Sequence, residues 1–173
     1  MKIVITGAGA VGYHLAKMLA SESQDIYLID SHEERLNYVT SHIDVYGICG
    51  DAKSFKVLQE AKIEECDLLI AVTSSEETNL LVSIIGKKMG AKQTIARISE
   101  LKTGDIDCEK FYNQLGVDTV ISPVILVQEE IQRLIHRAVF TDDHEFEDGK
   151  LTVFGIHIDG SSPLSGKTVA ESA

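Results

Sequence analysis

The sequence has no tryptophan, two prolines and three cysteines among its 173 residues. Cys49, Cys66 and Cys108 lie far apart and form no C-x-x-C pair, so neither a disulfide framework nor a cysteine-ligated zinc site is indicated. We expect buried thiols in a reducing, cytoplasmic environment. No apolar run approaches the ~20 residues of a membrane span, and no signal peptide is visible after Met1. We therefore predict a soluble protein without direct membrane insertion.

Positive charge is also scarce, with 16 lysines and arginines against 27 acidic residues and a net charge of −11. Nucleic-acid binding needs a basic face that neutralises phosphates, so we do not expect nucleic acid as a partner. The six histidines form no i, i+4 pair of the kind that binds zinc. The acidic run at 142–148 lacks EF-hand spacing, so no metal site is predicted.

The strongest motif lies in the first twenty residues. A short apolar run at 2–6, fit for a buried strand, leads directly into the G-x-G-x-x-G of 7–12. The apolar residues after it recur at helical spacing, which predicts a helix that begins on the glycines. A strand, a glycine loop and a helix in this order are typical of dinucleotide binding, whereas a lone glycine motif also occurs where helices pack closely.

Each position of this loop has a physical role in such a site. Gly7 permits the tight turn, Gly9 lets a pyrophosphate touch the backbone, and Gly12 lets the helix lie close to the strand. The helix begins near Ala10 and Val11, so its unpaired N–H groups and the positive end of its dipole face the phosphates.

The rest of the chain alternates apolar strand patterns with helical patterns. Further strands are expected at 25–29, 45–49, 68–73, 94–98 and 119–121. Ser31 is the predicted N-cap of the second helix, with Glu34 completing a capping box. Repeated β-α units predict a Rossmann-like, doubly wound parallel sheet of six strands with helices on both faces.

The composition changes after the sixth strand. Ser122-Pro123 is a strong helix start, and the helix that follows has a broad apolar face. An acidic loop is expected at 142–149, followed by strand material around 151–158. We predict a nucleotide-binding domain at 1–122, a linker or dimerisation helix with the acidic loop at 123–144, and the truncated start of a second domain at 145–173.

Candidate binding residues follow the predicted strands. Asp30 closes the second strand, where a carboxylate accepts hydrogen bonds from both ribose hydroxyls and repels a 2′-phosphate, which favours NAD or ATP/ADP over NADP. Ser31 and Arg35 follow it on the next helix, and both are included in the site. Asp51 and Ala52 follow the third strand, next to the expected adenine position, although Gly50-Asp51 also fits a plain turn.

The other half of the site is expected at the fourth and fifth strands. Thr73 ends the fourth strand and Ser74 opens the next helix, where it also fits a purely structural cap. Asn79 either reaches the ligand or lies on the helix surface. Arg97 stands in an apolar strand, and a buried guanidinium needs an anion, which is either a ligand phosphate or a carboxylate such as Asp51 or Glu77.

Together these segments resemble the N-terminal domains of the RCK (or KTN) family, the cytoplasmic regulators of potassium transport. The resemblance is carried by residues 2–12, 28–30, 50–52, 67–79, 95–98 and 116–123, and residues 160–169 resemble the opening of the family's C-terminal ligand domain. It implies a non-enzymatic sensor that binds NAD(H) or ATP/ADP and gates a Trk-type membrane potassium transporter or channel subunit. It also implies a homodimer or higher ring assembly, peripheral to the inner membrane through its partner.

Two other functions remain compatible with the residues. An NAD-dependent oxidoreductase that lacks its catalytic domain would share the fold, but it needs a general acid or base beside the nicotinamide. Thr73, Arg97 and Ser122 stand at the ends of the fourth to sixth strands, where such a group would be expected. A pure assembly domain with a structural nucleotide is the third possibility, because fold alone does not fix function.

Overall fold

The structure is a computed structural model that describes residues 1–99, 106–139, 142–146 and 151–155, with residues 160, 162, 165–168 and 171. Its contacts divide the chain into two compact units, Met1–Ile125 and Leu126–Ala173. The first unit contains the parallel sheet, and the second contains an antiparallel hairpin. None of the helices formed by these residues is long and apolar enough to cross a membrane.

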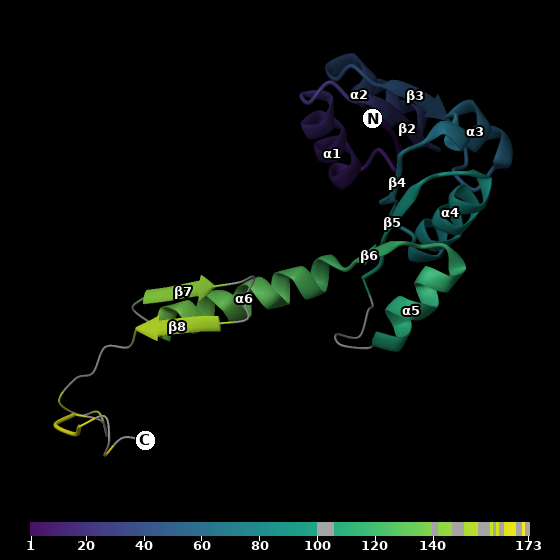
Figure 1. The fold of residues 1–173 in the computed structure, drawn as a ribbon. Coiled ribbons are helices and arrows are strands. Elements are labelled where there is room, and N and C mark those ends of the chain that lie inside the picture. The colour runs from purple at the N-terminus through teal and green to yellow at the C-terminus, as the bar shows by residue number, and fades with distance from the viewer. Residues whose placement is uncertain are drawn as a thin grey trace. The chain divides into compact units, whose positions relative to one another are not determined.

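The first unit is built on a six-stranded sheet with the strand order β3-β2-β1-β4-β5-β6 (Figure 1). The strands are β1 (Lys2–Thr6), β2 (Asp25–Asp30), β3 (Tyr46–Cys49), β4 (Leu68–Ala71), β5 (Gln93–Arg97) and β6 (Thr119–Ile121). All neighbouring pairs are parallel, which confirms the predicted Rossmann-like sheet. The order reverses between β1 and β4, and ligands of such sheets bind beside this point at the carboxyl ends of the strands.

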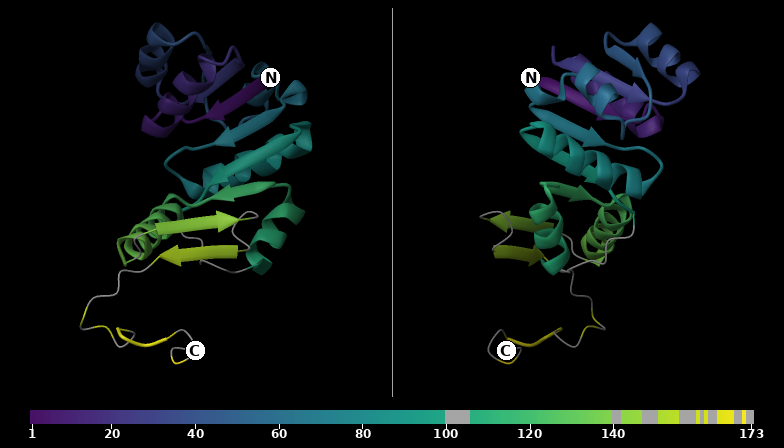
Figure 2. Two further views of the ribbon diagram at one scale, coloured as in Figure 1. Left: turned by 60° about the vertical axis from the view of Figure 1, so that its left-hand side comes forward. Right: turned by 90° about the vertical axis from the view of Figure 1, so that its right-hand side faces the viewer.

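Helices cover both faces of this sheet (Figure 2). Along β1, Ile3 and Ile5 join one buried cluster and Val4 joins the other, as the twofold repeat of a strand requires. Leu36 of α2 lies in the first cluster and Leu58 of α3 in the second. The helices of this unit are α1 (Ala10–Ala20), α2 (Glu33–His42), α3 (Phe55–Glu60), α4 (Glu76–Met89) and α5 (Ile106–Leu115), with a 3-10 turn at Ile63–Glu65.

The start of α2 differs from the prediction. His32, not Ser31, is the N-cap residue, and no side chain caps the helix. The turn is made instead by Asp30, whose Oδ1 accepts the backbone N–H of His32 at 2.8 Å. The predicted burial of the thiols is also wrong for Cys49, which is exposed, whereas Cys66 is buried. The side chain of Cys108 lies outside the described residues.

Helix α6 (Pro123–Val139) begins at the predicted serine-proline pair. The predicted acidic loop is wrong for most of its length, because Asp142–Phe146 forms strand β7. This strand pairs in antiparallel register with β8 (Leu151–Gly155), whose β-prone residues provide the partner that the acidic run alone did not suggest. The predicted strand material at 156–158 lies outside the described residues, and the proposed domain boundaries stay a prediction.

Candidate functional site

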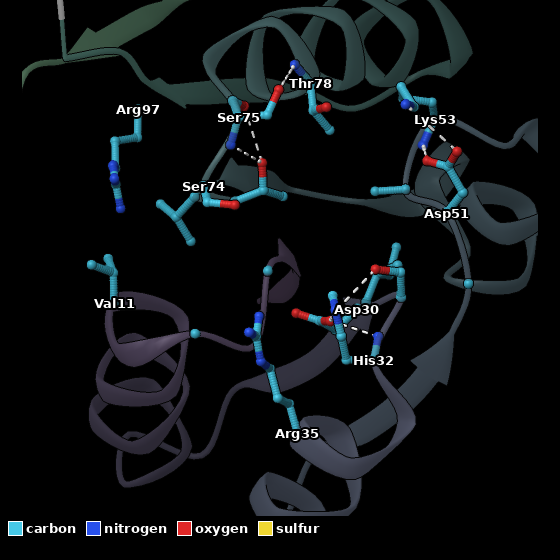
Figure 3. A pocket seen from close by; sticks show the side chains of 18 of the residues that line it. Val11, Asp30, His32, Arg35, Asp51, Lys53, Ser74, Ser75, Thr78 and Arg97 are labelled. Carbon is cyan, nitrogen blue, oxygen red and sulfur yellow. Dashed lines mark hydrogen bonds and ion pairs between the residues drawn. The ribbon is translucent and has the colours of Figure 1, made fainter.

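The carboxyl ends of five strands surround one hollow of about 490 Å³. This is within the range of small-molecule sites, roughly 300–1,000 Å³. Figure 3 shows Asp30 and Arg35 on one side of the hollow, with Ser74 and Arg97 across from them. The lining residues are Gly7, Gly9, Ala10, Val11, Ile29, Asp30, Ser31, His32, Arg35, Gly50, Asp51, Ala52, Lys53, Val72, Thr73, Ser74, Ser75, Thr78 and Arg97.

The glycine loop has the geometry that the motif predicts. Gly7 has φ +103°, a conformation that L side chains rarely adopt, and a Cβ there would lie 3.0 Å from the backbone of Thr73. A Cβ on Gly12 would overlap the carbonyl oxygen of Gly7, so this glycine permits the close approach of α1. Gly12 itself is buried and does not line the hollow. Gly12 therefore positions α1 against the loop without touching the hollow.

Gly9 differs from the other two glycines, because a Cβ on it would meet no protein atom within 4 Å. The space beside it is open and belongs to the hollow. Gly9 is also the N-cap of α1, whose first turn has no side-chain cap and no acidic residue. Ala10 and Val11 therefore bring an uncapped helix N-terminus to the hollow, an arrangement that suits phosphate groups.

Asp30 connects the loops around the hollow. Only 8% of this residue is exposed. Its Oδ2 accepts the backbone N–H of Ala8 at 2.6 Å, and its backbone carbonyl accepts that of Gly50 at 2.9 Å. Burial by itself would raise the pKa of the carboxyl, but hydrogen bonds from His32 and Ala8 outweigh it and hold the pKa below its usual value. Asp30 is thus a carboxylate at neutral pH.

The predicted residues beside Asp30 all line the hollow. Ser31 does so from the turn before α2, and Arg35 does so from the first turn of α2. Arg35 is thereby close enough to share the hollow with Asp30, although the sequence places it a helical turn further on. Asp51 and Ala52 line it after β3, and the Asp51 carboxylate lies 3.6 Å from the Lys53 ammonium.

The loop between β4 and α4 supplies hydroxyl groups. Ser75 is the N-cap of α4, and its Oγ accepts the backbone N–H of Thr78 at 3.1 Å. Ser74 precedes it and is exposed to the hollow, and Thr73 lines the hollow as predicted. The Thr73 hydroxyl is 2.7 Å from Oδ1 of Asn79 and 3.1 Å from the carbonyl of Ser75.

Asn79 is placed differently from both predicted alternatives. It is 1% exposed, does not line the hollow and does not lie on the helix surface. Its Oδ1 accepts the Thr73 N–H at 2.8 Å, while its Nδ2 donates to the carbonyls of Thr73 at 3.1 Å and Arg97 at 2.9 Å. In this conformation Asn79 does not reach the hollow. The side chain instead holds the ends of β4 and β5 together.

Arg97 lines the hollow from the end of β5 and is half-buried rather than buried. The predicted alternative of an ion pair with Asp51 or Glu77 does not occur. Asp51 pairs with Lys53, and the Glu77 carboxylate accepts the Ser75 hydroxyl at 2.9 Å. Within the described part of the chain, no carboxylate forms an ion pair with Arg97.

Seven lining residues were not among the predicted site residues: Ile29, His32, Gly50, Lys53, Val72, Ser75 and Thr78. The spacing of Lys53, two residues after Asp51, is a signal that could have identified it. With Arg35 and Arg97, Lys53 gives the hollow three cationic side chains against two carboxylates, although the chain carries a net charge of −11. The hollow therefore combines an uncapped helix start with cations that can bind phosphates. Among the described residues, no cluster of three or more acidic, histidine or cysteine side chains could hold a metal.

Comparisons with known proteins identify the family to which the first unit belongs. The TrkA-N domain family matches residues 3–123. The Trk system potassium uptake protein TrkA homolog of Archaeoglobus fulgidus is 37% identical over 171 residues, which are 99% of this chain and 38% of that protein. A homolog of the same name from Methanothermobacter thermautotrophicus is 32% identical and is covered to 76%. The chain thus spans less than two-fifths of the length of the first of these relatives.

The solved structures that share the fold include two complexes of one channel. The GsuK channel bound to NAD superposes with a TM-score of 0.61 at 16% identity, over 98% of this chain and 30% of the channel chain. GsuK bound to ADP gives a TM-score of 0.61 at 21% identity, over 79% of this chain and 34% of that one. The family match covers the glycine loop, Asp30 and Arg97 in one continuous segment. The chain belongs to the TrkA-N domain family.

Proposed function

We propose that this chain is the nucleotide-binding part of a regulatory subunit of a Trk-type potassium uptake system. It binds NAD(H) or ATP/ADP and gates a membrane potassium-translocating partner from the cytoplasmic side. The proposal rests on one arrangement above all: the glycine loop and the Asp30 carboxylate meet at the carboxyl edge of the sheet, joined by the Ala8–Asp30 hydrogen bond. The TrkA relatives supply the link to potassium uptake.

The choice of ligand follows from the charges in the hollow. The open space at Gly9 suits a pyrophosphate or polyphosphate chain beside the start of α1. Asp30 suits an adenosine ribose with free hydroxyls, and Arg97 supplies a cation on the far side of the hollow. The NAD and ADP complexes of the fold neighbour GsuK support the same two ligand classes.

Regulation rather than catalysis is supported by the residues on the β4–β5 side. There the lining consists of Val72, hydroxyl residues and Arg97, whereas His32 and Lys53 belong to the β2–β3 side with Asp30. If Asp30 binds the adenosine ribose, the described residues provide no histidine, lysine or tyrosine beside the nicotinamide. A dehydrogenase needs such a proton donor or acceptor. The oxidoreductase alternative requires that another part of the parent protein supplies it.

Gating requires a difference in affinity between two states of the partner complex. A nucleotide that binds both states with equal affinity does not shift the equilibrium between them, however tightly it binds. NADH and ATP differ in everything beyond the adenosine and its first phosphates, so the β4–β5 side is where they would be distinguished. The assembly acts at the inner membrane through its partner, as a peripheral component.

The test combines calorimetry of nucleotide binding with measurements of NADH oxidation and of potassium flux. The purified chain is titrated with NADH, NAD⁺, ATP and ADP, and NADH with a panel of carbonyl substrates is followed for oxidation. The proposal predicts binding without turnover. A full-length subunit reconstituted with its Trk-type membrane partner should then change potassium flux when the nucleotide is exchanged. Absence of nucleotide binding, or steady NADH oxidation, would contradict the proposal.

A further inference from the structure

The carboxylate of Asp30 is nearly saturated before any ligand binds. Oδ2 accepts one hydrogen bond, from the N–H of Ala8 at 2.6 Å. Oδ1 accepts two, from the backbone N–H of His32 at 2.8 Å and, in the tautomer protonated at Nδ1, from the His32 ring at 3.1 Å. A carboxylate offers about four places for donors. Three of them are occupied, so only one remains free.

An adenosine ribose brings two hydroxyl donors to this carboxylate in the proposed binding mode. One hydroxyl can take the free place on Oδ2, and the second must displace a donor that is already bound. The N–H groups of Ala8 and His32 belong to the backbone of the two loops and are fixed there. The His32 ring is different, because its side chain is 62% exposed and can rotate away. It is the donor that a ribose would replace.

We propose that His32 is a positioning residue whose imidazole competes with the ligand ribose for Asp30, so that protonation of His32 weakens nucleotide binding. The inference rests on the proposed function, because it assumes that the ribose binds Asp30. A neutral imidazole holds the carboxylate by an ordinary hydrogen bond and is released readily. An imidazolium forms a charge-assisted bond, which is about twice as strong. In the acidic range the ring therefore keeps its place on Oδ1 and the ribose loses one of its contacts.

Other charged and titratable groups lie on the elements around His32. Asp30 contacts the ring directly, and the Ser31 hydroxyl lies 3.2 Å from Nδ1. The glycine loop brings no titratable side chain among its lining residues. The other titratable or charged side chains of α2 are Glu33, Glu34, Arg35, Tyr38 and His42. Those of β3 are Tyr46 and Cys49, and Asp51 and Lys53 line the hollow after it. His42 of α2 and His14 of α1 are the other histidines of these neighbouring helices, and neither lines the hollow.

The test is a pH series of NAD⁺ binding by calorimetry, because NAD⁺ has no group that titrates between pH 5.5 and 8. If only the neutral ring yields to the ribose, the dissociation constant rises about five- to ten-fold from pH 8 to pH 5.5. In His32→Ala and His32→Asn, which cannot take up a proton, the change should be less than about two-fold. His14→Ala is the matched control, since His14 is an exposed histidine on α1 that does not line the hollow; it should keep the full pH dependence.

A second pH series varies the ligand and leaves the protein unaltered. Adenosine should show the same pH dependence on the unaltered chain, and 2′,3′-dideoxyadenosine, which lacks the 2′ and 3′ hydroxyls that would displace the ring, should show none. This arm holds even if a His32 variant does not fold, which thermal unfolding would reveal. Tighter NAD⁺ binding at pH 5.5, or equal pH profiles for wild type and both His32 variants, would overturn the inference. Failure of every nucleotide to bind at any pH would instead reject the proposed function.

Discussion

The Asp30 carboxylate and the backbone N–H of Ala8 are joined by a hydrogen bond of 2.6 Å across 22 residues of sequence. This bond fixes the end of β2 against the loop that follows β1. The carboxylate expected to bind the ribose hydroxyls therefore also positions the loop expected to bind the phosphates. The two halves of the candidate site are therefore structurally coupled. For each substitution in the site, the free energy of unfolding should be measured together with nucleotide affinity.

Two glycines of the loop should have different roles: Gly9 in nucleotide binding and Gly12 in folding. Gly9→Val places a side chain in open space at φ −71°, which any residue adopts, so the domain should fold normally and lose nucleotide binding. Gly12→Val would overlap Gly7, and it should lower the free energy of unfolding by about 1–3 kcal/mol or prevent folding. Urea unfolding and calorimetry on both variants test this. Unchanged ATP affinity in a folded Gly9→Val would show that the phosphates lie elsewhere.

Arg97 should act on phosphates and not on the nucleoside. Loss of a charge-assisted hydrogen bond costs about 1.5–3 kcal/mol, so Arg97→Ala should weaken ATP binding at least ~10-fold. Adenosine affinity should stay within about two-fold, because adenosine carries no phosphate. Lys92→Ala is the charge-matched control: it precedes β5 at the opposite edge of the sheet, where Lys92 pairs with Asp67. Undiminished ATP affinity in Arg97→Ala would remove Arg97 from the site.

Asn79 should prove structural. Asn79→Ala removes every hydrogen bond that this side chain makes to Thr73 and Arg97 and leaves partly buried backbone groups unpaired. We expect a loss of about 1–3 kcal/mol in the free energy of unfolding, from the unpaired groups. Nucleotide affinity, measured well below the melting temperature, should fall less than in Arg97→Ala. A variant of full stability that cannot bind nucleotide would show a direct contact that the present conformation lacks.

Helix α6 should mediate self-association. Val127, Ile131 and Leu134 follow one another at helical spacing, and each is more than half exposed. Such a stripe is a typical association surface. Light scattering at tens of micromolar should give a homodimer or larger assembly, and Ile131→Glu should shift it toward the monomer. Gln132→Glu adds the same charge at a neighbouring exposed position and should leave the mass unchanged. A monomer mass for the unaltered chain would contradict this prediction.

Much of the first unit could be predicted from local patterns. The buried strands are continuous apolar runs such as Leu69 to Val72, and the turn at Gly7 needs a residue that tolerates φ +103°. These features depend on neighbouring residues, so the sequence displays them directly. The order of the strands, β3-β2-β1-β4-β5-β6, was not predicted, because it depends on pairing between segments far apart in the chain.

Several departures from prediction depend on contacts that local patterns do not display. Asn79 is a helix residue whose partners, Thr73 and Arg97, lie on two different strand ends. Ser31 fits a capping box by sequence, but Asp30 makes that turn while also binding Ala8. The acidic run of β7 has low strand propensity and is extended because β8 pairs with it. Local propensity cannot report such partners.

Asp30 as the ribose anchor is the central claim, and a side-by-side titration of NADH and NADPH tests it most directly. Asp30→Asn is the variant of choice, because its side-chain oxygen can still accept the N–H of Ala8 without the charge. The 2′-phosphate of NADPH would bring like charge to the buried carboxylate, while Arg35 in the same hollow offsets part of that repulsion. We predict that wild type binds NADH at least ~10-fold more tightly than NADPH, about 1.4 kcal/mol, and that the gap narrows in Asp30→Asn. Equal affinities for NADH and NADPH in the wild type would contradict the assignment.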